Sequence, residues 1–180
     1  MRRCIASIVP RWSHAPTSGA GAAVKGGRFN RPGLEALYLS LTAATALEEY
    51  RQHARLLPPG TLATFLVSRL RVVDFSAGYA AGKWHPLWAD YACNWRQLAF
   101  VRGVEPASWV WGDLAIDAGA AGILFPSTVC PGSTNLVLFH SSALLPEVLR
   151  VHDPRGDLPH DGQSWQAPQI HTILQKGSLD

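Results

Sequence analysis

The sequence predicts a single domain of the α+β class. Of its 180 residues 47% are hydrophobic and 16% are charged, a balance that suits one compact core and excludes disordered or fibrous chains. Short apolar runs typical of buried strands alternate with turns and with stretches of helical character. We expect one domain over residues 1–180, with its core at about residues 11–152 and a turn-rich tail at residues 153–180.

The N-terminal part of the chain predicts a long loop, a short strand and a helix. Residues 12–34 are rich in Gly, Ser, Ala and Pro, and a loop of this length in a compact domain is usually functional. The apolar run at residues 36–40 is typical of a short buried strand. Thr42 is a suitable N-cap for a helix from residue 43 to about residue 56, which Pro58-Pro59-Gly60 would end.

The two adjacent glutamates of that helix fall on different faces. Glu48 lies nearly opposite the apolar face, close to Arg51 and Arg55, and is expected to be a solvated surface residue. Glu49 and His53 lie one turn apart at the border of the apolar face. Glu49 is therefore the candidate for a role inside a cleft, whereas a histidine in this position is more often packed than a base. The face expected to meet the core consists of Ala43, Ala46, Leu47, Tyr50, Ala54 and Leu57.

The rest of the chain predicts further strands and a tryptophan-rich helical layer. Five of the seven tryptophans lie between residues 84 and 111, in segments that favour two or three short helices broken by Gly103 and Pro106. Rings of this size more often build a core than stack on a ligand, so we expect them to form the core of that layer. Strands are expected at residues 61–68, 71–74, 122–126 and 135–140, with an edge strand at 147–152.

Positive charge is concentrated at the N-terminal end of the chain. Up to Leu34 there are six cations and no acid, whereas the remainder has ten cations against thirteen acids. This asymmetry favours an anionic partner, such as a phosphorylated small molecule, nucleic acid or an acidic protein, although a solvated basic edge would have the same charge. Nucleic acid is less favoured, because the sequence contains no helix-turn-helix, zinc-finger or RNA-binding signature.

Cysteine usage and hydropathy indicate a cytoplasmic protein. Cys4, Cys93 and Cys130 are odd in number and widely spaced, so neither a disulfide framework nor a zinc site is predicted. The apolar stretch at residues 4–9 is too short for a signal peptide, and no run approaches membrane-spanning length. We therefore expect a soluble protein with no membrane association.

A glycine turn followed by a tyrosine is the first candidate for a ligand site. The turn Gly26-Gly27-Arg28-Phe29-Asn30 lets the backbone approach a ligand closely, and Arg28 supplies a planar set of donors that suits phosphate. Tyr38 offers a flat face for stacking, although a tyrosine in an apolar strand is often simply part of the core. Further candidates beside turns are Glu49, Ser127 and Asn135, with Asn30, Lys25 and Arg11 weaker.

Five short motifs follow one another along the chain: Gly26-Gly27-Arg28-Phe29-Asn30, Ala36-Leu37-Tyr38-Leu39-Ser40, Ala46-Leu47-Glu48-Glu49-Tyr50, Gly122-Ile123-Leu124-Phe125-Pro126-Ser127 and Asn135-Leu136-Val137-Leu138-Phe139. In this order, over roughly residues 11–140, they resemble the RES-domain family. That family is named for its Arg, Glu and Ser and consists of toxins of bacterial toxin–antitoxin pairs. The resemblance implies a fold similar to the ADP-ribosyltransferase toxins, in which a split central β-sheet with surrounding helices forms a cleft for NAD.

The resemblance also implies an activity and a partner. Family members break the bond between nicotinamide and ribose, and they pass ADP-ribose either to water or phosphate, which depletes NAD, or to a cellular protein. NAD would be a substrate, and no metal is expected. A cognate Xre-like antitoxin would cover the active site, so that nucleic acid would be contacted only through the antitoxin.

The site residues that the resemblance implies are Arg28, Tyr38, Glu49 and Ser127. Cleavage of an N-glycosidic bond places positive charge on the ribose, so a carboxylate such as Glu49 would stabilise the transition state. Arg28 would bind the pyrophosphate or a ribose edge, Tyr38 would stack on nicotinamide, and Ser127 would orient the amide or ribose. Additional NAD contacts are expected from Asn30, Asn135 and Lys25.

Other interpretations remain open at this point. The chain fits a catalytically silent nucleotide-binding or protein-interaction module with the same fold, while a thiol hydrolase based on Cys130 or Cys93 lacks any local signature. Arg28 could instead bind loop carbonyls, Glu49 could form a border salt bridge, and Ser127 could cap a turn. The sequence leaves open which acceptor receives the sugar and whether the tryptophan-rich segment shapes the cleft.

Overall fold

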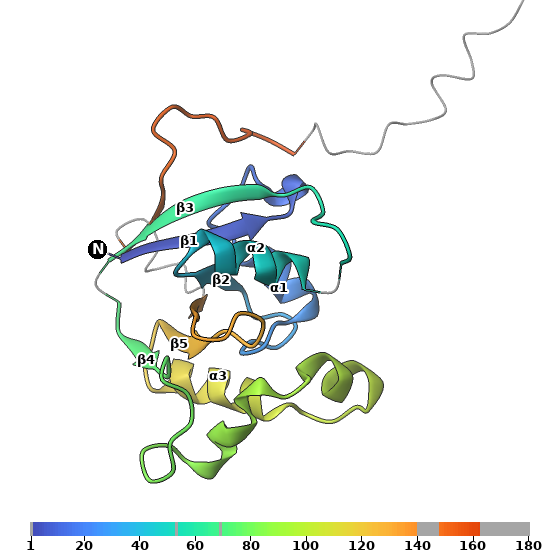
Figure 1. The fold of residues 1–180 in the computed structure, drawn as a ribbon, viewed down its shortest axis with the longest axis vertical. Helices are drawn as coiled ribbons and strands as arrows, with labels where there is room; N and C mark the ends of the chain where they lie inside the picture. The colour runs from blue at the N-terminus through green and yellow to red at the C-terminus, as the bar shows by residue number, and fades with distance from the viewer. Residues whose placement is uncertain (1, 53, 69, 140–147, 163–180) are drawn as a thin grey trace, which may run out of the picture.

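The computed structural model describes residues 2–52, 54–68, 70–139 and 148–162. Its centre is a mixed seven-stranded sheet with the order β4-β5-β6-β2-β1-β3-β7 (Figure 1). All neighbouring strands are antiparallel except β4 and β5, which run parallel. The strands are β1 (Arg2–Ile8), β2 (Ala36–Ser40), β3 (Thr61–Val67), β4 (Val72–Asp74), β5 (Gly122–Pro126), β6 (Thr134–Phe139) and β7 (Leu149–Val151).

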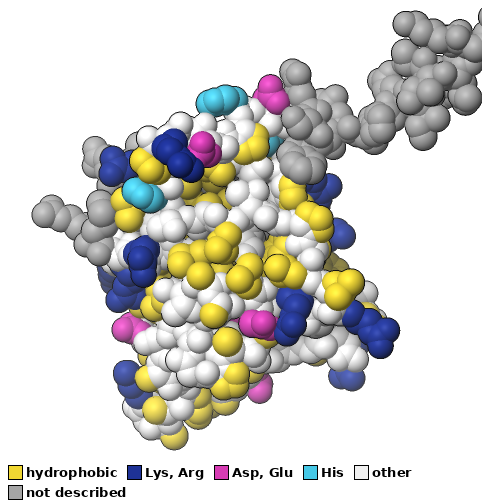
Figure 2. Space-filling model, turned by 45° about the horizontal axis from the view of Figure 1, so that its top comes forward, with side chains coloured by type: hydrophobic (Ala, Val, Ile, Leu, Met, Phe, Trp, Pro, Cys, Tyr) yellow, Lys and Arg dark blue, Asp and Glu magenta, His cyan; other side chains and the backbone are white. Residues whose placement is uncertain are grey.

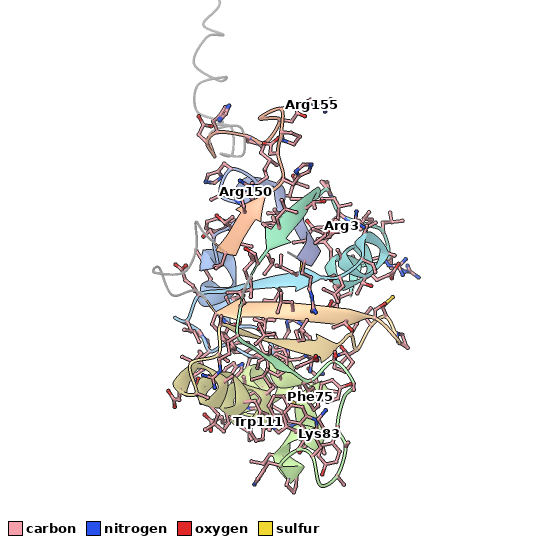
Figure 3. The ribbon with its side chains drawn as sticks, turned by 90° about the vertical axis from the view of Figure 1, so that its left-hand side faces the viewer. Arg3, Phe75, Lys83, Trp111, Arg150 and Arg155 are labelled. Atoms are coloured by element: carbon pink, nitrogen blue, oxygen red, sulfur yellow. The ribbon has the colours of Figure 1, made fainter. Side chains whose placement is uncertain are left out.

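The sheet is split between β1 and β2. The pairing of β1 with β2 is reduced to a single register pair, Ile5 with Ser40, whereas β1 pairs with β3 along its whole length. Figure 3 shows that the strands on the two sides of this split run at a steep angle to each other. A break in a ladder separates the two backbones, and the space that it leaves is available to side chains and ligands.

Six helical segments accompany the sheet among the elements assigned in the described residues. The short α1 (Ala20–Lys25) contacts β2, α2 (Ala43–Arg51) contacts β1 and β2 on the two sides of the split, and the larger α3 (Ala107–Asp117) contacts β5. Thr42 is the N-cap of α2, as the sequence predicts, because its hydroxyl accepts a hydrogen bond from the Thr45 amide at 3.2 Å. The remaining segments are η1 (Pro10–Trp12), η2 (Pro86–Ala92) and the π-helical turn η3 (Gln97–Val101).

The sheet separates two apolar clusters, because successive side chains of a strand point to opposite faces. Leu37 and Leu39 of β2 belong to one cluster together with Cys4 and Leu136. Ala36 and Tyr38 belong to the other cluster, which contains most of the aromatic rings. Figure 3 shows two of these rings, Phe75 and Trp111, close together on the helical side of the sheet.

The tryptophan-rich segment forms a packed helical layer, as expected. Trp88, Trp95, Trp109 and Trp111 are all buried, and Trp84 packs on Phe75 with 5.0 Å between the ring centroids. Gly112 fixes how closely α3 approaches the glycine turn, since a Cβ at this position would collide with the Phe29 carbonyl. The layer therefore rests directly on the Gly26–Asn30 turn.

Two expectations about the N-terminal elements need correction. The sheet begins at Arg2, ahead of the core predicted to start near residue 11, with β1 as an inner strand that the sequence analysis did not predict. The segment at residues 12–34 is not all loop, because it contains Trp12 of η1 and the short helix α1. The apolar and small residues of these segments pack through long-range contacts that a local sequence pattern does not reveal.

The helix predicted to extend to about residue 56 ends at Arg51. The backbone leaves the helical conformation at Gln52, and the chain moves away from the sheet. Ala54 and Leu57 are therefore exposed and do not belong to the core-facing side, and His53 lies outside the described residues. Further along the chain, the predicted strands are confirmed, including the edge strand, for which the structure describes Leu149–Val151.

Residues 153–162 contain turns and bends without a helix or strand, in keeping with the predicted tail. The remainder of that tail lies outside the described residues. Within the described part of the chain, no helix combines the length and the apolar character needed to cross a membrane.

Candidate active site

A cavity of about 290 Å³ opens where the sheet splits between β1 and β2. This volume lies near the lower end of the range for small-molecule sites. The glycine turn forms one wall, α2 a second, and the start of the helical layer a third. The residues that line the cavity and enter the argument below are Gly27, Arg28, Tyr38, Glu49, Gln52, Trp95, Arg96 and Asn135.

The Glu49 carboxylate is held by three side-chain donors. Its Oε1 accepts hydrogen bonds from the Ser127 hydroxyl at 2.7 Å and from the Asn135 amide at 2.6 Å, and its Oε2 accepts from Gln52 at 2.7 Å. Ser127 and Asn135 are both buried, with 6% and 5% of their surface exposed. A carboxylate with buried donors on one oxygen is fixed in position.

The supports of Glu49 come from the ends of two strands. Asn135 lies near the start of β6, where its amide oxygen accepts a hydrogen bond from the Ser40 hydroxyl at 2.7 Å. Ser127 follows β5 directly, and its hydroxyl also accepts hydrogen bonds from the backbone amides of Val129 and Cys130. Ser127 therefore caps a turn and binds Glu49 at the same time, so the two roles considered for it are compatible.

The glycine turn is built around Tyr38 and Asn30. The Tyr38 hydroxyl accepts a hydrogen bond from the Phe29 amide at 2.9 Å and donates to the Asn30 side chain at 2.8 Å. A Cβ on Gly27 would lie 2.6 Å from the Asn30 side-chain oxygen and would collide with the Tyr38 hydroxyl. Only glycine fits at this position, because the turn packs directly on the tyrosine.

Tyr38 thus has a structural role in addition to its place in the cavity wall. Burial raises the pKa of its phenol well above the ordinary value, and the hydrogen bond from Phe29 and the positive charges of Arg28 and Arg96 oppose this shift only in part. The phenol is therefore neutral, with its hydroxyl engaged, and its ring is the part of the side chain available to a ligand.

Arg28 reaches from the glycine turn to the helical layer. Its Nη1 donates to the backbone carbonyls of Tyr91 at 2.6 Å and Cys93 at 3.1 Å, and its Nη2 lies 3.4 Å from the Thr128 hydroxyl. Burial lowers the pKa of Arg28, and the Cys93, Tyr38 and Glu49 groups oppose that shift. Arg28 thus donates to loop carbonyls through one nitrogen and also lines the cavity. Among the described residues that line the cavity, Glu49 is the one with a carboxylate.

The structure brings together most of the residues that the sequence singled out. Arg28, Tyr38, Glu49 and Asn135 line one cavity, and Ser127 lies directly behind Glu49. Asn30 and Lys25 are not in this group, so their expected contact with a ligand has no support in the structure. Asn30 is fully buried, with its amide directed at the carbonyls of Ala22, Arg31 and Leu34, and Lys25 is exposed at the end of α1.

The cavity residues that the sequence analysis left without a role include Gln52, Trp95 and Arg96. Gln52 follows the end of α2, where a longer predicted helix concealed its position beside Glu49. Trp95 and Arg96 belong to the tryptophan-rich segment, which therefore does shape the cleft. No local motif identifies them, because they meet the glycine turn only through tertiary packing.

The donor set of the cavity suits an anionic or polar organic ligand. Within the residues that the structure describes, no group of three or more His, Cys, Asp or Glu side chains is arranged to hold a metal ion. A fixed carboxylate, two guanidinium groups and aromatic rings instead provide one anionic position, two cationic positions and flat apolar surfaces. Such a combination fits a ligand that carries phosphate together with a ring.

Comparison with known proteins agrees with this fold. The RES domain model matches residues 2–169. A protein of Yersinia enterocolitica named Toxin Res is 28% identical over 135 residues, which cover 73% of this chain and 79% of that protein. The crystal structure of the M. tuberculosis MbcT–MbcA toxin–antitoxin complex contains a chain with the same fold, at a TM-score of 0.60 and 21% identity, with 84% of this chain and 81% of that chain covered. This protein belongs to the RES domain family.

Proposed function

We propose that this protein is the toxin of a toxin–antitoxin pair and that it consumes NAD by breaking the bond between nicotinamide and ribose. Membership of the RES domain family and the name of the Yersinia relative support the toxin role. The arrangement around Glu49 supports the chemistry. Consumption of cellular NAD would place the action of the toxin in the cytoplasm.

The observation that carries the proposal is the fixed Glu49 carboxylate in the cavity wall. As the glycosidic bond breaks, its electron pair leaves with the nicotinamide nitrogen and positive charge develops on the ribose. A carboxylate held in advance stabilises this charge more than it stabilises the substrate, and such preorganisation needs no rearrangement during the reaction. The acceptor then forms a bond to the anomeric carbon and loses its proton.

The remaining cavity residues have complementary roles in this proposal. The face of the Tyr38 ring would stack on nicotinamide, because its hydroxyl is already engaged in the turn. Arg28 would bind the pyrophosphate through the donors that the carbonyls of Tyr91 and Cys93 leave unused. Ser127 and Asn135 would act as positioning residues, because their hydrogen bonds are made to Glu49.

The direct test is incubation of the purified protein with NAD, followed by NMR of the products. We expect release of nicotinamide. The identity of the second product distinguishes the acceptors, because free ADP-ribose indicates water, an ADP-ribose phosphate ester indicates phosphate, and labelled protein in a cell extract indicates a transferase. Intact NAD under all three conditions would contradict the proposed chemistry.

A cognate antitoxin is the proposed partner, and we expect an Xre-like protein that covers the cavity and provides any contact with nucleic acid. Phe100 lies beside the cavity wall, with 57% of its surface exposed and its ring centroid 6.1 Å from that of Trp95. Figure 2 shows a face with a band of hydrophobic side chains, Lys and Arg on both sides of it, and scattered Asp and Glu. Such a surface suits a protein partner with apolar and acidic groups.

A catalytically silent module with the same fold is the alternative. It would bind NAD in the same cavity without breaking the bond, and the engaged state of Glu49, whose two oxygens already accept three hydrogen bonds, is the observation in its favour. Calorimetric binding of NAD without release of nicotinamide in the presence of water, phosphate or cell extract would favour this alternative.

A further inference from the structure

Arg96 occupies a cavity position that the proposed roles above leave unassigned. Its guanidinium lies over the indole of Trp95, with 4.5 Å between its central carbon and the ring centroid. Trp95 is itself buried against Trp109, at 6.4 Å between the ring centroids. The arginine therefore rests on a rigid platform, which lowers the entropic cost of holding its planar donor set in one orientation.

Most donors of Arg96 have no hydrogen-bond partner among the described residues. Within this part of the chain its one hydrogen bond is long, from Nη1 to the side-chain oxygen of Gln52 at 3.4 Å. Among the residues that the structure describes, no carboxylate forms an ion pair with Arg96, whereas Arg31, Arg51 and Arg155 all have such partners. A preoriented cation without a counter-ion at a cavity wall is a binding group for an anion.

Arg28 alone is poorly equipped to bind a diphosphate. Two backbone carbonyls already occupy its Nη1, and the cavity that it faces also contains the negative Glu49. A diphosphate carries two negative charges, so its binding in this cavity calls for a second cation. Arg28 and Arg96 both line the same cavity. Both also lie near Tyr38, where their positive charges partly oppose the rise in its pKa that burial causes.

We propose that Arg96, held flat on Trp95, is the second phosphate-binding residue of the cavity and that the two arginines together select ligands with a diphosphate. The choice of a dinucleotide as the ligand rests on the proposed function. The proposed preference for a diphosphate follows from the positions of Arg28 and Arg96 in the cavity wall. Binding of inorganic pyrophosphate therefore tests this preference independently of any reaction with NAD. Binding of a phosphate by Arg96 would replace its weak contact with Gln52.

The test is calorimetric binding of three probes, ADP-ribose, pyrophosphate and nicotinamide, to the full-length protein. Arg96→Ala is expected to weaken the binding of ADP-ribose and of pyrophosphate by about tenfold or more, as the loss of a charge-assisted hydrogen bond does, and to leave nicotinamide binding unchanged. Arg96→Lys should recover part of the loss, because it keeps the charge but not the planar stacking. Arg102→Ala is the matched control, since this arginine is exposed, follows the same helical turn and does not line the cavity.

Three results would overturn the proposal: equal affinities of Arg96→Ala and the parent protein for the phosphate-containing probes, equal weakening of all three probes, or no binding of either phosphate-containing probe to the parent protein. Failure of the proposed function has a different signature. Pyrophosphate binding that depends on Arg96, without nicotinamide release from NAD, would support the diphosphate site and contradict the NAD chemistry.

Discussion

Two arginines lie three residues apart, Arg28 in the glycine turn and Arg31 directly after it, and their electrostatic surroundings are opposite. Arg31 points to the helix side, where Glu105 and Asp113 form ion pairs with it and the Trp109 ring lies 5.7 Å from its guanidinium. Arg28 points to the cavity side, where its hydrogen bonds go to backbone carbonyls and a hydroxyl. Arg31 is thus paired with two carboxylates, whereas Arg28 has donors that an anionic ligand could use.

The pKa values of the two arginines shift in opposite directions for this reason. The hydrogen bond to Asp113 is the main cause that raises the pKa of Arg31, whereas burial lowers the pKa of Arg28. Compensated charge stabilises a fold only modestly at a surface, whereas a buried cation without a carboxylate partner costs stability and is typical of functional sites. The difference teaches that Arg31 serves the structure, whereas Arg28 suits the proposed ligand site.

The largest effect that this comparison predicts follows from Glu49→Gln on the cavity side. We expect nicotinamide release to fall by about 10²-fold to 10³-fold, because the amide keeps the shape but not the charge that stabilises the transition state. Glu48→Gln is the matched control, since the neighbouring carboxylate is bound to Arg51 at 2.6 Å and lies outside the cavity. Similar losses in both variants would show that the distinction between the two glutamates is wrong.

The second effect separates the two arginines directly. Arg28→Ala should lower kcat/KM for NAD by about 10-fold to 100-fold, as expected when a charged hydrogen-bond donor is removed from a ligand. Arg31→Ala should leave kcat/KM unchanged and lower the free energy of unfolding by about 1 kcal/mol, because it loses exposed ion pairs and a cation–π contact. Steady-state kinetics and urea unfolding of both variants measure these effects. A loss of kcat/KM in Arg31→Ala with none in Arg28→Ala would contradict the comparison.

The third effect concerns the turn that joins the two sides. Gly27→Ala should lower the free energy of unfolding by about 1–3 kcal/mol, because the added methyl group would collide with the Tyr38 hydroxyl. Gly21→Ala in α1 is the control, as its nearest neighbour for a new Cβ is the Trp12 ring at 3.9 Å, an ordinary contact. Thermal unfolding of the two variants measures the difference, and equal midpoints would contradict the packing described for the turn.

The smallest effect is a pH dependence on the opposite face of the sheet, away from both sides of the turn. Burial raises the pKa of the Cys4 thiol from 9.0 to about 11, and the nearby Arg2 charge opposes this shift. A raised pKa in the folded state means that the stabilising contribution is complete below pH 9 and is lost as the pH rises through about 11. Between pH 9 and about 11 the free energy of unfolding should therefore fall less steeply in Cys4→Ala than in the parent protein. The NAD turnover of this variant at neutral pH should match that of the parent protein.

Sequence reasoning located the strands other than β1 and the start of α2 because their signals are local. Thr42 is a cap whose hydroxyl accepts a hydrogen bond from the Thr45 amide, only three residues further on, and the helical wheel separates Glu49 from Glu48 without any tertiary information. The glycine turn was also visible from the sequence alone. The exact partners of Glu49 were not, because Ser127 and Asn135 lie 78 and 86 residues away along the chain.

The errors have a common physical origin in tertiary packing. β1 begins with Arg2 and Arg3, which conceal its strand character, and only its pairing with β2 and β3 makes it an inner strand. Asn30 resembles a ligand-binding residue in a polar turn, yet the backbone carbonyls around it and Tyr38 occupy its amide group. Arg96 was overlooked for the opposite reason, since its place beside Glu49 and Gln52 arises from the position of the helical layer.

The central claim is that Glu49 acts on the transition state rather than on the binding of NAD. The most direct measurement compares the Kd for NAD, from calorimetry, with the single-turnover rate of nicotinamide release in the parent protein and in Glu49→Gln. The account predicts Kd values within about threefold of each other and a single-turnover rate that falls by about 10²-fold or more. Equal rates in the two proteins, or a loss confined to Kd, would contradict it.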